Sequence, residues 1–223
     1  MEPFTKLTAI AAPLDMANVD TDKIIPGRFL RKLRGPGYDK LAFHDIRFNT
    51  DGSENPDFVL NKAPYRAAKI LVAAANFGCG SSREAAVYVL WDFGIRCVIA
   101  PSFGDIHYGN ELQNGMLPVV LPDAACATLR AQLHANPGAT VAVDLDAQKV
   151  TGPDGTVYPF DIDAGHKERL VKGLDDIGLV MQYEKEIEAF ETRHRASMPW
   201  LASGRTPPTT GRPTGRAQLT APP

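Results

Sequence analysis

The chain has 223 residues, 44% of them hydrophobic, which is enough to bury a substantial core in one domain or in a domain with an appendage. Its formal net charge of −2 gives no excess of basic groups to attract a nucleic acid or an anionic membrane surface. No apolar run approaches the ~20 residues that span a bilayer, and the first residues do not resemble an export signal. We therefore expect a cytoplasmic protein that binds neither nucleic acid nor membrane.

The first third of the chain shows mainly loop signals. Residues 7–26 end in the polar run NVDTD followed by Ile-Ile-Pro, which indicates a loop that leads into a short apolar segment. Residues 30–38 (LRKLRGPGY) combine basic side chains with Gly-Pro-Gly, a composition typical of an exposed, mobile loop. Residues 49–56 (NTDGSENP) form another loop, rich in residues that stabilise turns.

Strands and helices then alternate. Short apolar runs predict buried strands, and the longer runs between them have the apolar spacing or the position of helices. This strand–helix–strand order predicts parallel neighbours joined by right-handed crossovers. The sequence predicts strands over 69–75, 96–100 and 117–121, and helices over 84–93 (ending at Gly94) and about 104–114.

The last third begins with a helix over 123–135, for which Asp123 is the expected N-cap. Strands over 140–145 and 156–160 flank a turn at 152–155 and are expected to form a hairpin. Further helices are predicted over 167–172 and 181–194, separated by GLDDIG. We expect residues 1–200 to form the folded domain and residues 201–223, rich in Pro, Thr, Gly and Arg, to be a disordered tail.

The three cysteines, Cys79, Cys97 and Cys126, are an odd number in a chain without an export signal, which argues against a disulfide framework. They form no CxxC pair and no close His/Cys cluster that would hold zinc or iron and sulfur. We expect no metal site and no cofactor in this chain. If an iron–sulfur cluster participates, another chain must bind it.

The segment 78–84 (GCGSSRE) carries more chemistry than any other. One interpretation is a capping box, in which Ser81 and Glu84 satisfy the N-terminus of the following helix. The other is an anion site, because glycines such as Gly80 admit a ligand close to the backbone and a helix N-terminus presents free N–H donors. Arg83 is unfavourable for the helix dipole but suits a carboxylate. A small di- or tricarboxylate fits this segment better than a phosphate.

Five segments also point to a known family. They are NVDTDKIIPGRFL (18–30), NPDFVLN (55–61), NFGCGSSRE (76–84), GIRCVIAPSFGDI (94–106) and GLDDIGL (173–179). In this order they resemble the 3-isopropylmalate dehydratase small-subunit family of the aconitase superfamily, over roughly residues 5–195. The resemblance implies an α/β aconitase-like swivelling domain, with a mixed or parallel sheet and flanking helices.

The resemblance further implies a hydro-lyase of leucine biosynthesis that interconverts 2-isopropylmalate and 3-isopropylmalate by removing and adding water. Such an enzyme is active only with a large subunit, which carries a [4Fe-4S] cluster as Lewis acid. By the same resemblance Ser81 is the catalytic base, and Gly80, Ser82 and Arg83 contact the dicarboxylate substrate. A serine needs nearby donors and positive charge to act as a base, and the helix N-terminus and Arg83 could provide them.

Other positions carry two interpretations each. The loop 30–38 occupies the segment that selects the substrate side chain in relatives, so Leu30, Leu33 and Tyr38 are candidates for recognising the substituent; a solvated basic loop is the alternative. The run 20–22 either shapes the cleft or forms a turn through side-chain hydrogen bonds. His107, in a helical pattern, is expected to be structural, and Cys79 to have a supporting role.

The sequence also departs from the family pattern. Ala85 follows Glu84 where many members have a histidine, and residues 164–169 (AGHKER) replace a segment rich in His and Cys. These changes leave open a paralogue that acts on a related acid, such as 2-methylmalate or maleate. A non-catalytic carboxylate-binding module is a further alternative. A nucleotide-binding α/β protein is disfavoured, because neither dinucleotide nor P-loop glycine spacing occurs.

Overall fold

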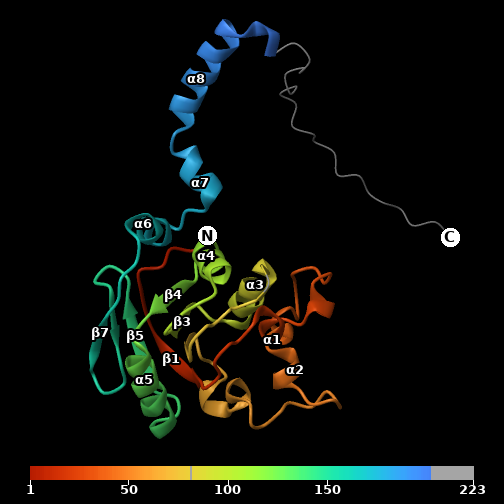
Figure 1. Cartoon of the computed structure of the whole chain (residues 1–223), viewed down its shortest axis with the longest axis vertical. Coiled ribbons are helices and arrows are strands. Elements are labelled where there is room, and N and C mark those ends of the chain that lie inside the picture. Colours follow the sequence, from red (N-terminus) through yellow and green to blue (C-terminus); the bar gives the residue numbers. More distant parts are fainter. Residues whose placement is uncertain (81, 202–223) are drawn as a thin grey trace, which may run out of the picture. The chain divides into compact units, whose positions relative to one another are not determined.

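The computed structural model describes residues 1–80 and 82–201. The chain divides into two compact units, Met1–Leu179 and Val180–Pro223. The first unit contains a seven-stranded sheet with the strand order β4-β3-β2-β1-β5-β6-β7 (Figure 1). Its strands are β1 (Lys6–Leu14), β2 (Ile70–Ala73), β3 (Cys97–Ala100), β4 (Leu117–Val120), β5 (Thr140–Asp144), β6 (Lys149–Thr151) and β7 (Val157–Pro159).

The sheet is mixed. Strands β1 to β4 are parallel, and β5, β6 and β7 continue the sheet antiparallel from the other side of β1. Strand β1 is offset between its neighbours: residues 6–10 pair with β5, and residues 11–14 pair with β2. The predicted mixed or parallel sheet with flanking helices is confirmed.

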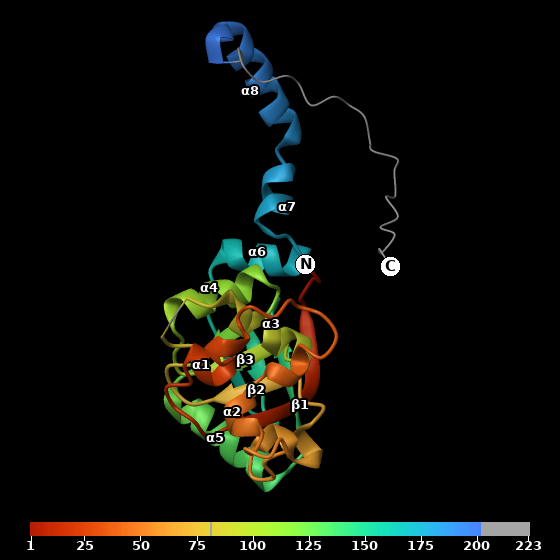
Figure 2. The ribbon, with the colours of Figure 1, turned by 90° about the vertical axis from the view of Figure 1, so that its right-hand side faces the viewer.

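Helices cover both faces of the sheet in the first unit (Figures 1 and 2). Figure 2 shows α1, α2 and α3 on the side that faces the viewer. The α-helices of the described residues are α1 (Thr21–Ile24), α2 (His44–Arg47), α3 (Glu84–Phe93), α4 (Asp105–Gln113), α5 (Asp123–Ala135), α6 (Ala164–Lys172), α7 (Asp176–Met181) and α8 (Glu184–Ser197). Short 3₁₀ turns occupy Gly27–Phe29, Asp39–Leu41, Val59–Asn61, Ala63–Tyr65 and Pro199–Leu201.

Alternation along the parallel strands divides the core into two clusters. Leu71 of β2 packs with the buried face of α3 in one cluster, and Val72 packs with α5 and with Leu170 of α6 in the other. Successive side chains of a strand point to opposite faces, so a strand buried on both faces is apolar throughout. This explains why β2 and β3 read as unbroken apolar runs.

The helix predicted over 84–93 is confirmed with these bounds, and Gly94 ends it in a left-handed conformation with φ 112°. The strands predicted over 69–75, 96–100 and 117–121 and the helix over about 104–114 are confirmed with ends shifted by a few residues at most. The helices predicted over 167–172 and 181–194 correspond to α6, which begins earlier, and to α8.

Several expectations were wrong. No strand was predicted before residue 69, but residues 6–14 form β1, the strand between the two halves of the sheet. The expected hairpin of 140–145 with 156–160 is instead a three-stranded meander, because β6 lies between β5 and β7. Strand β6 has only three residues, of which only Val150 is fully buried. It is therefore too short to show the alternation of apolar and polar residues that predicts a strand. Helix α7 begins inside the GLDDIG segment.

The remaining differences concern helix starts and the tail. Pro122 is the N-cap of α5 and Asp123 is its first residue, so Asp123 is not the cap. The predicted tail 201–223 lies, apart from Leu201, outside the described residues. Within the described ranges, no helix combines the length and the apolar content that crossing a membrane requires.

Candidate functional site

The polar motifs meet at the carboxyl ends of the parallel strands. The chain leaves β1, β2 and β3 there, and the loops that follow lie side by side. The amide of Gly78 donates to the carbonyl of Val19 at 2.7 Å, and the side-chain amide of Asn76 donates to Asn18 at 2.7 Å. The third loop joins through Ser102, whose carbonyl accepts from the amide of Phe77 at 3.0 Å. Ligand sites of open α/β sheets lie at this edge.

The 20–22 segment forms the turn stabilised by side-chain hydrogen bonds that was one of its two interpretations. Asp20 is the N-cap of α1, because its carboxylate accepts from the amide of Lys23 at 2.7 Å. Next to it, the amide of Thr21 donates to the carbonyl of Cys79 at 3.0 Å. The segment is therefore a capped turn. It also holds the neighbouring loop of residues 76–80, called the glycine-rich loop below.

Arg83 forms an ion pair with Asp22, which links the helix start to the first loop. The arginine side chain is 19% exposed and the aspartate side chain 58%. The same carboxylate accepts from the amide of Gly27 at 3.1 Å. The hydrogen bond from Arg83 lowers the pKa of Asp22 from its ordinary value. A guanidinium has five N–H donors, so the pairing leaves donors for a ligand carboxylate at the rim of the site.

Helix α3 begins later than a capping box requires. Its N-cap is Arg83 and its first residue is Glu84, whereas the capping box would place the cap at Ser81 and Glu84 at the third helical position. Arg83 therefore lies just before the first turn of α3 and not inside it. The carboxylate of Glu84 accepts from Asn114 of the neighbouring helix end at 2.9 Å. The capping-box interpretation was therefore wrong.

The other predicted residues of the motif flank one position that lies outside the described residues, Ser81. Gly80 is exposed with φ 91°, a conformation that favours glycine, and Ser82 is exposed. Both therefore stand at the surface beside the partly buried Arg83. Asp22 was not predicted as the partner of Arg83. The polar run NVDTD, which ends in Asp22, had indicated only a turn or a contribution to the cleft.

The predicted recognition loop separates into exposed and buried parts. Leu30 is 44% exposed and Leu33 is 89% exposed, so both are available to a ligand or a partner. Tyr38 is 3% exposed and packs in the core, where burial raises the pKa of its hydroxyl. Its position therefore indicates a packing role in the structure as described.

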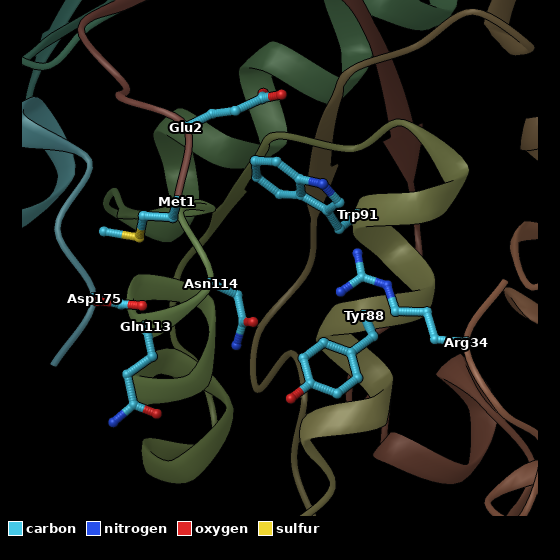
Figure 3. A pocket seen from close by; sticks show the side chains of 8 residues that line it. All are labelled: Met1, Glu2, Arg34, Tyr88, Trp91, Gln113, Asn114 and Asp175. Atoms are coloured by element: carbon cyan, nitrogen blue, oxygen red, sulfur yellow. The ribbon is translucent and has the colours of Figure 1, made fainter. Parts of the chain in front are cut away.

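Arg34 fixes this loop to α3. Its guanidinium donates to Asp92 at 2.9 Å from Nε and lies 5.0 Å from the ring centre of Tyr88. Arg34 and Tyr88 also face a cavity of about 370 Å³ that Trp91 and Asn114 help to line (Figure 3). Neither Gly80, Ser82 nor Arg83 lines this cavity, so it is separate from the loop edge described above.

The thiols and the histidine are placed as follows. Cys79 is partly exposed, and Cys97 and Cys126 are buried; all three are free. Burial raises the pKa of Cys126 to about 11. His107 is buried in α4 and 2% exposed. Across residues 1–80 and 82–201, no group of three or more His, Cys, Asp or Glu side chains is arranged to hold a metal ion, so these residues do not fit an iron–sulfur cluster.

Family models match most of the chain. The aconitase C-terminal domain matches residues 1–124, and the LeuD_N model matches residues 127–164. The C-terminal domain of the 3-isopropylmalate dehydratase small subunit matches residues 176–203. The first match alone covers more than half of the chain and contains all the polar loops of the candidate site.

Curated relatives and a solved structure agree with these matches. A 3-isopropylmalate dehydratase small subunit of Paramagnetospirillum magneticum is 54% identical over 90% of this chain and 100% of its own length. That of Rhodospirillum rubrum is 53% identical over 90% of this chain and 97% of its own length. The crystal structure of a 3-isopropylmalate dehydratase from Methanocaldococcus jannaschii has a TM-score of 0.60 at 25% identity, over 83% of this chain and 99% of that one.

Proposed function

Because this chain belongs to the 3-isopropylmalate dehydratase small-subunit family, we propose that it builds one wall of a hydro-lyase active site shared with a large subunit. The composite enzyme interconverts 2-isopropylmalate and 3-isopropylmalate, a step of leucine biosynthesis, in the cytoplasm. The observation that carries this proposal is the Arg83–Asp22 ion pair at the mouth of α3, beside the exposed Gly80 and Ser82.

The residues of this chain supply positioning and proton transfer. Arg83, with Ser82 and the backbone at Gly80, binds a carboxylate of the substrate, because a guanidinium fork matches a carboxylate. Ser81 takes the proton from the substrate carbon. The positive charge of Arg83 and the N-terminal end of α3 favour the deprotonated serine. When a [4Fe-4S] cluster is bound to the large subunit, it supplies the Lewis acid for the hydroxyl group.

The exposed residues Leu30 and Leu33 are proposed to contact the side chain of the substrate. Leu30 and Leu33 extend from a loop whose next arginine, Arg34, is fixed to α3. An apolar substituent such as the isopropyl group would meet them when the site closes against the large subunit. Discrimination by one or two apolar contacts is worth about 1–3 kcal/mol, so this loop can bias the choice among related diacids.

The test is activity of the reconstituted pair. The chain is co-expressed with its large subunit, the cluster is reconstituted anaerobically, and 2-isopropylmalate, 2-methylmalate and maleate are assayed. We expect Ser81→Ala to lower kcat by about 10²–10⁴-fold while the complex still assembles on gel filtration. Ser53→Ala changes an exposed serine that lies outside the motif and serves as the control.

Three results would contradict the proposal. Normal turnover by Ser81→Ala would reject the assigned base. A pair that binds the diacids without converting any of them would favour a carboxylate-binding module. Stoichiometric iron and sulfide on the isolated small subunit would show that the cluster belongs to this chain and not to its partner.

A further inference from the structure

Two ionisable side chains are sealed inside the first unit, away from the residues assigned to the reaction. His107 and Glu111 lie one turn apart on α4, and their side chains are 1% and 0% exposed. Nε2 of His107 is 3.0 Å from Oε1 of Glu111. Within the described part of the chain, neither side chain has a hydrogen-bond partner outside this pair. Burial raises the pKa of Glu111.

Such a pair is a poor source of stability. Removing two polar groups from water costs more than a single contact between them returns, and apolar residues of similar volume often stabilise a core better. The presence of this pair in a mainly apolar core therefore needs an explanation other than stability. The contacts of the imidazole provide one.

The imidazole of His107 lies directly under the glycine-rich loop. A Cβ placed on Gly78 would lie 2.1 Å from Cγ of His107, so only glycine leaves room for the ring. Gly78 also has φ 70°, which favours glycine independently of the ring. The ring of Phe77 packs edge-on against the same imidazole, with 5.4 Å between ring centres.

Backbone hydrogen bonds also hold the loop. Gly78 donates to Val19, and Cys79 accepts from Thr21, as described above. Gly104, just before α4, donates to the carbonyl of Phe77 at 2.8 Å. The loop is therefore hydrogen-bonded to residues 19 and 21 and to Gly104, and it contacts the imidazole through Gly78 and Phe77.

We propose that Glu111 fixes the ring of His107 against Gly78, which makes His107 a positioning residue for the turn that leads through Gly80 into Ser81 and Arg83. This inference rests on the proposed function for its effect on turnover, but its effect on the loop does not depend on any substrate. The carboxylate contact sets the rotation of the ring, which packing alone leaves less defined for a flat side chain.

The test compares three single variants of α4 in the complete complex. Glu111→Leu removes the polar contact and keeps the site apolar, and Glu111→Gln keeps a carbonyl that can bond to the imidazole. Leu112→Ala is the matched control, because Leu112 is also buried in α4 but belongs to the cluster on the other face of the sheet. Unfolding in urea first shows how much stability each variant loses.

We expect Glu111→Leu to lower kcat roughly 10- to 100-fold, since small displacements of reacting groups are costly, while KM and the affinity for the large subunit should change less than about twofold. Glu111→Gln should restore most of kcat. Leu112→Ala should retain kcat, even where it unfolds at lower urea than Glu111→Leu. Normal kcat in Glu111→Leu, or an equal loss in Leu112→Ala, would overturn the positioning role.

A second measurement separates this inference from the proposed function. Cys79 is the partly exposed thiol of the loop, whereas Cys97 and Cys126 are buried. The rate at which iodoacetamide alkylates Cys79 in the isolated chain should rise severalfold in Glu111→Leu and stay unchanged in Leu112→Ala. An inactive wild-type complex with this alkylation pattern would refute the proposed function alone. An unchanged rate in Glu111→Leu would refute the positioning role alone.

Discussion

The parallel and the antiparallel halves of the sheet differ in how their strands are buried and in where their polar contacts lie. In the parallel half, β2 and β3 are buried on both faces, and polar contacts gather in the loops at the carboxyl ends of the strands. In the antiparallel half, β5 alternates between buried positions and partly buried or exposed ones, and the middle residue of β7 is partly buried between two exposed ones. A strand covered on both faces has no place for polar side chains along its length, so its chemistry is confined to its end.

The difference also concerns how each half is held together. The loops at the carboxyl edge are joined by hydrogen bonds and by the Arg83–Asp22 ion pair, which require specific partners. The antiparallel strands are joined mainly by the sheet ladder and by packing, with one ion pair, Lys6–Asp144, across β1 and β5. Substitutions at the edge should therefore alter activity more than stability, and substitutions in the core of the parallel strands should do the reverse.

Among the substitutions that compare the two halves, the largest effect is expected at the edge, for Arg83→Lys. The lysine keeps the charge but loses the planar fork, so it cannot bind Asp22 and a substrate carboxylate in the same geometry. We expect kcat/KM to fall by about 100-fold, which corresponds to ~2.7 kcal/mol of transition-state stabilisation. Arg66→Lys is the control, because Arg66 forms an exposed ion pair with Glu54 outside the site. A comparable loss in that control would remove the argument for the fork.

The next effect is expected in the core and should leave activity intact in the protein that remains folded. Val72→Ala removes two methyl groups from a fully buried position of β2, and we expect a loss of about 2 kcal/mol in the free energy of unfolding. Val157→Ala makes the same change on β7, where the side chain is 50% exposed, and should stay within about 0.5 kcal/mol. Equal losses in urea unfolding would contradict the division between the two halves.

Local signals in the sequence were sufficient for much of the parallel half. Helix α3 was predicted with its true bounds, because its apolar positions recur at helical spacing and Gly94 provides the left-handed end. Strands β2 and β3 were recognised from unbroken apolar runs. In each case the pattern that sets the structure lies within a dozen residues.

Strand β1 was missed because its sequence argues against a central strand. Its residues, KLTAIAAPL, include small side chains and Pro13, and proline cannot donate to a sheet ladder. The structure accommodates Pro13 because this part of β1 pairs with β2 only, whereas β5 pairs with residues 6–10. The offset between the two partners is a tertiary property that no local pattern reports.

In the candidate site, too, contacts between distant parts of the chain could not be predicted from local patterns. The resemblance to the family selected Arg83, Ser82 and Gly80, and the structure places them at one edge of the sheet. The partners that hold this edge, Asp22 and His107, come from distant parts of the chain, so their contacts arise only when the strands are ordered. The family resemblance therefore predicted the residues that react with or bind the substrate, whereas only the structure shows the residues that hold them in place.

The smallest effect concerns pH. Asp45 accepts from Arg28 at 2.7 Å, and this guanidinium, followed by weaker help from His44, holds the pKa of Asp45 at about 2, below its ordinary value of 3.8. A carboxyl group with a lowered pKa in the folded state stabilises the protein above its unfolded pKa, and this contribution disappears as the pH falls from 3.8 toward about 2. Both side chains are half-exposed, so solvent screening limits the contribution to about 1 kcal/mol or less.

Asp45→Asn should therefore unfold at lower urea than the wild type at pH 7, and the two proteins should converge as the pH is lowered through this range. Asp144→Asn tests the other half, because Asp144 pairs with Lys6 at 2.9 Å across β1 and β5 and its pKa is also lowered by that side chain. We expect the same sign and a smaller difference, since one exposed ammonium replaces a two-pronged guanidinium. A larger effect at Asp144 would show that the ion pair across β1 and β5 contributes more to stability than the Arg28–Asp45 pair of α2.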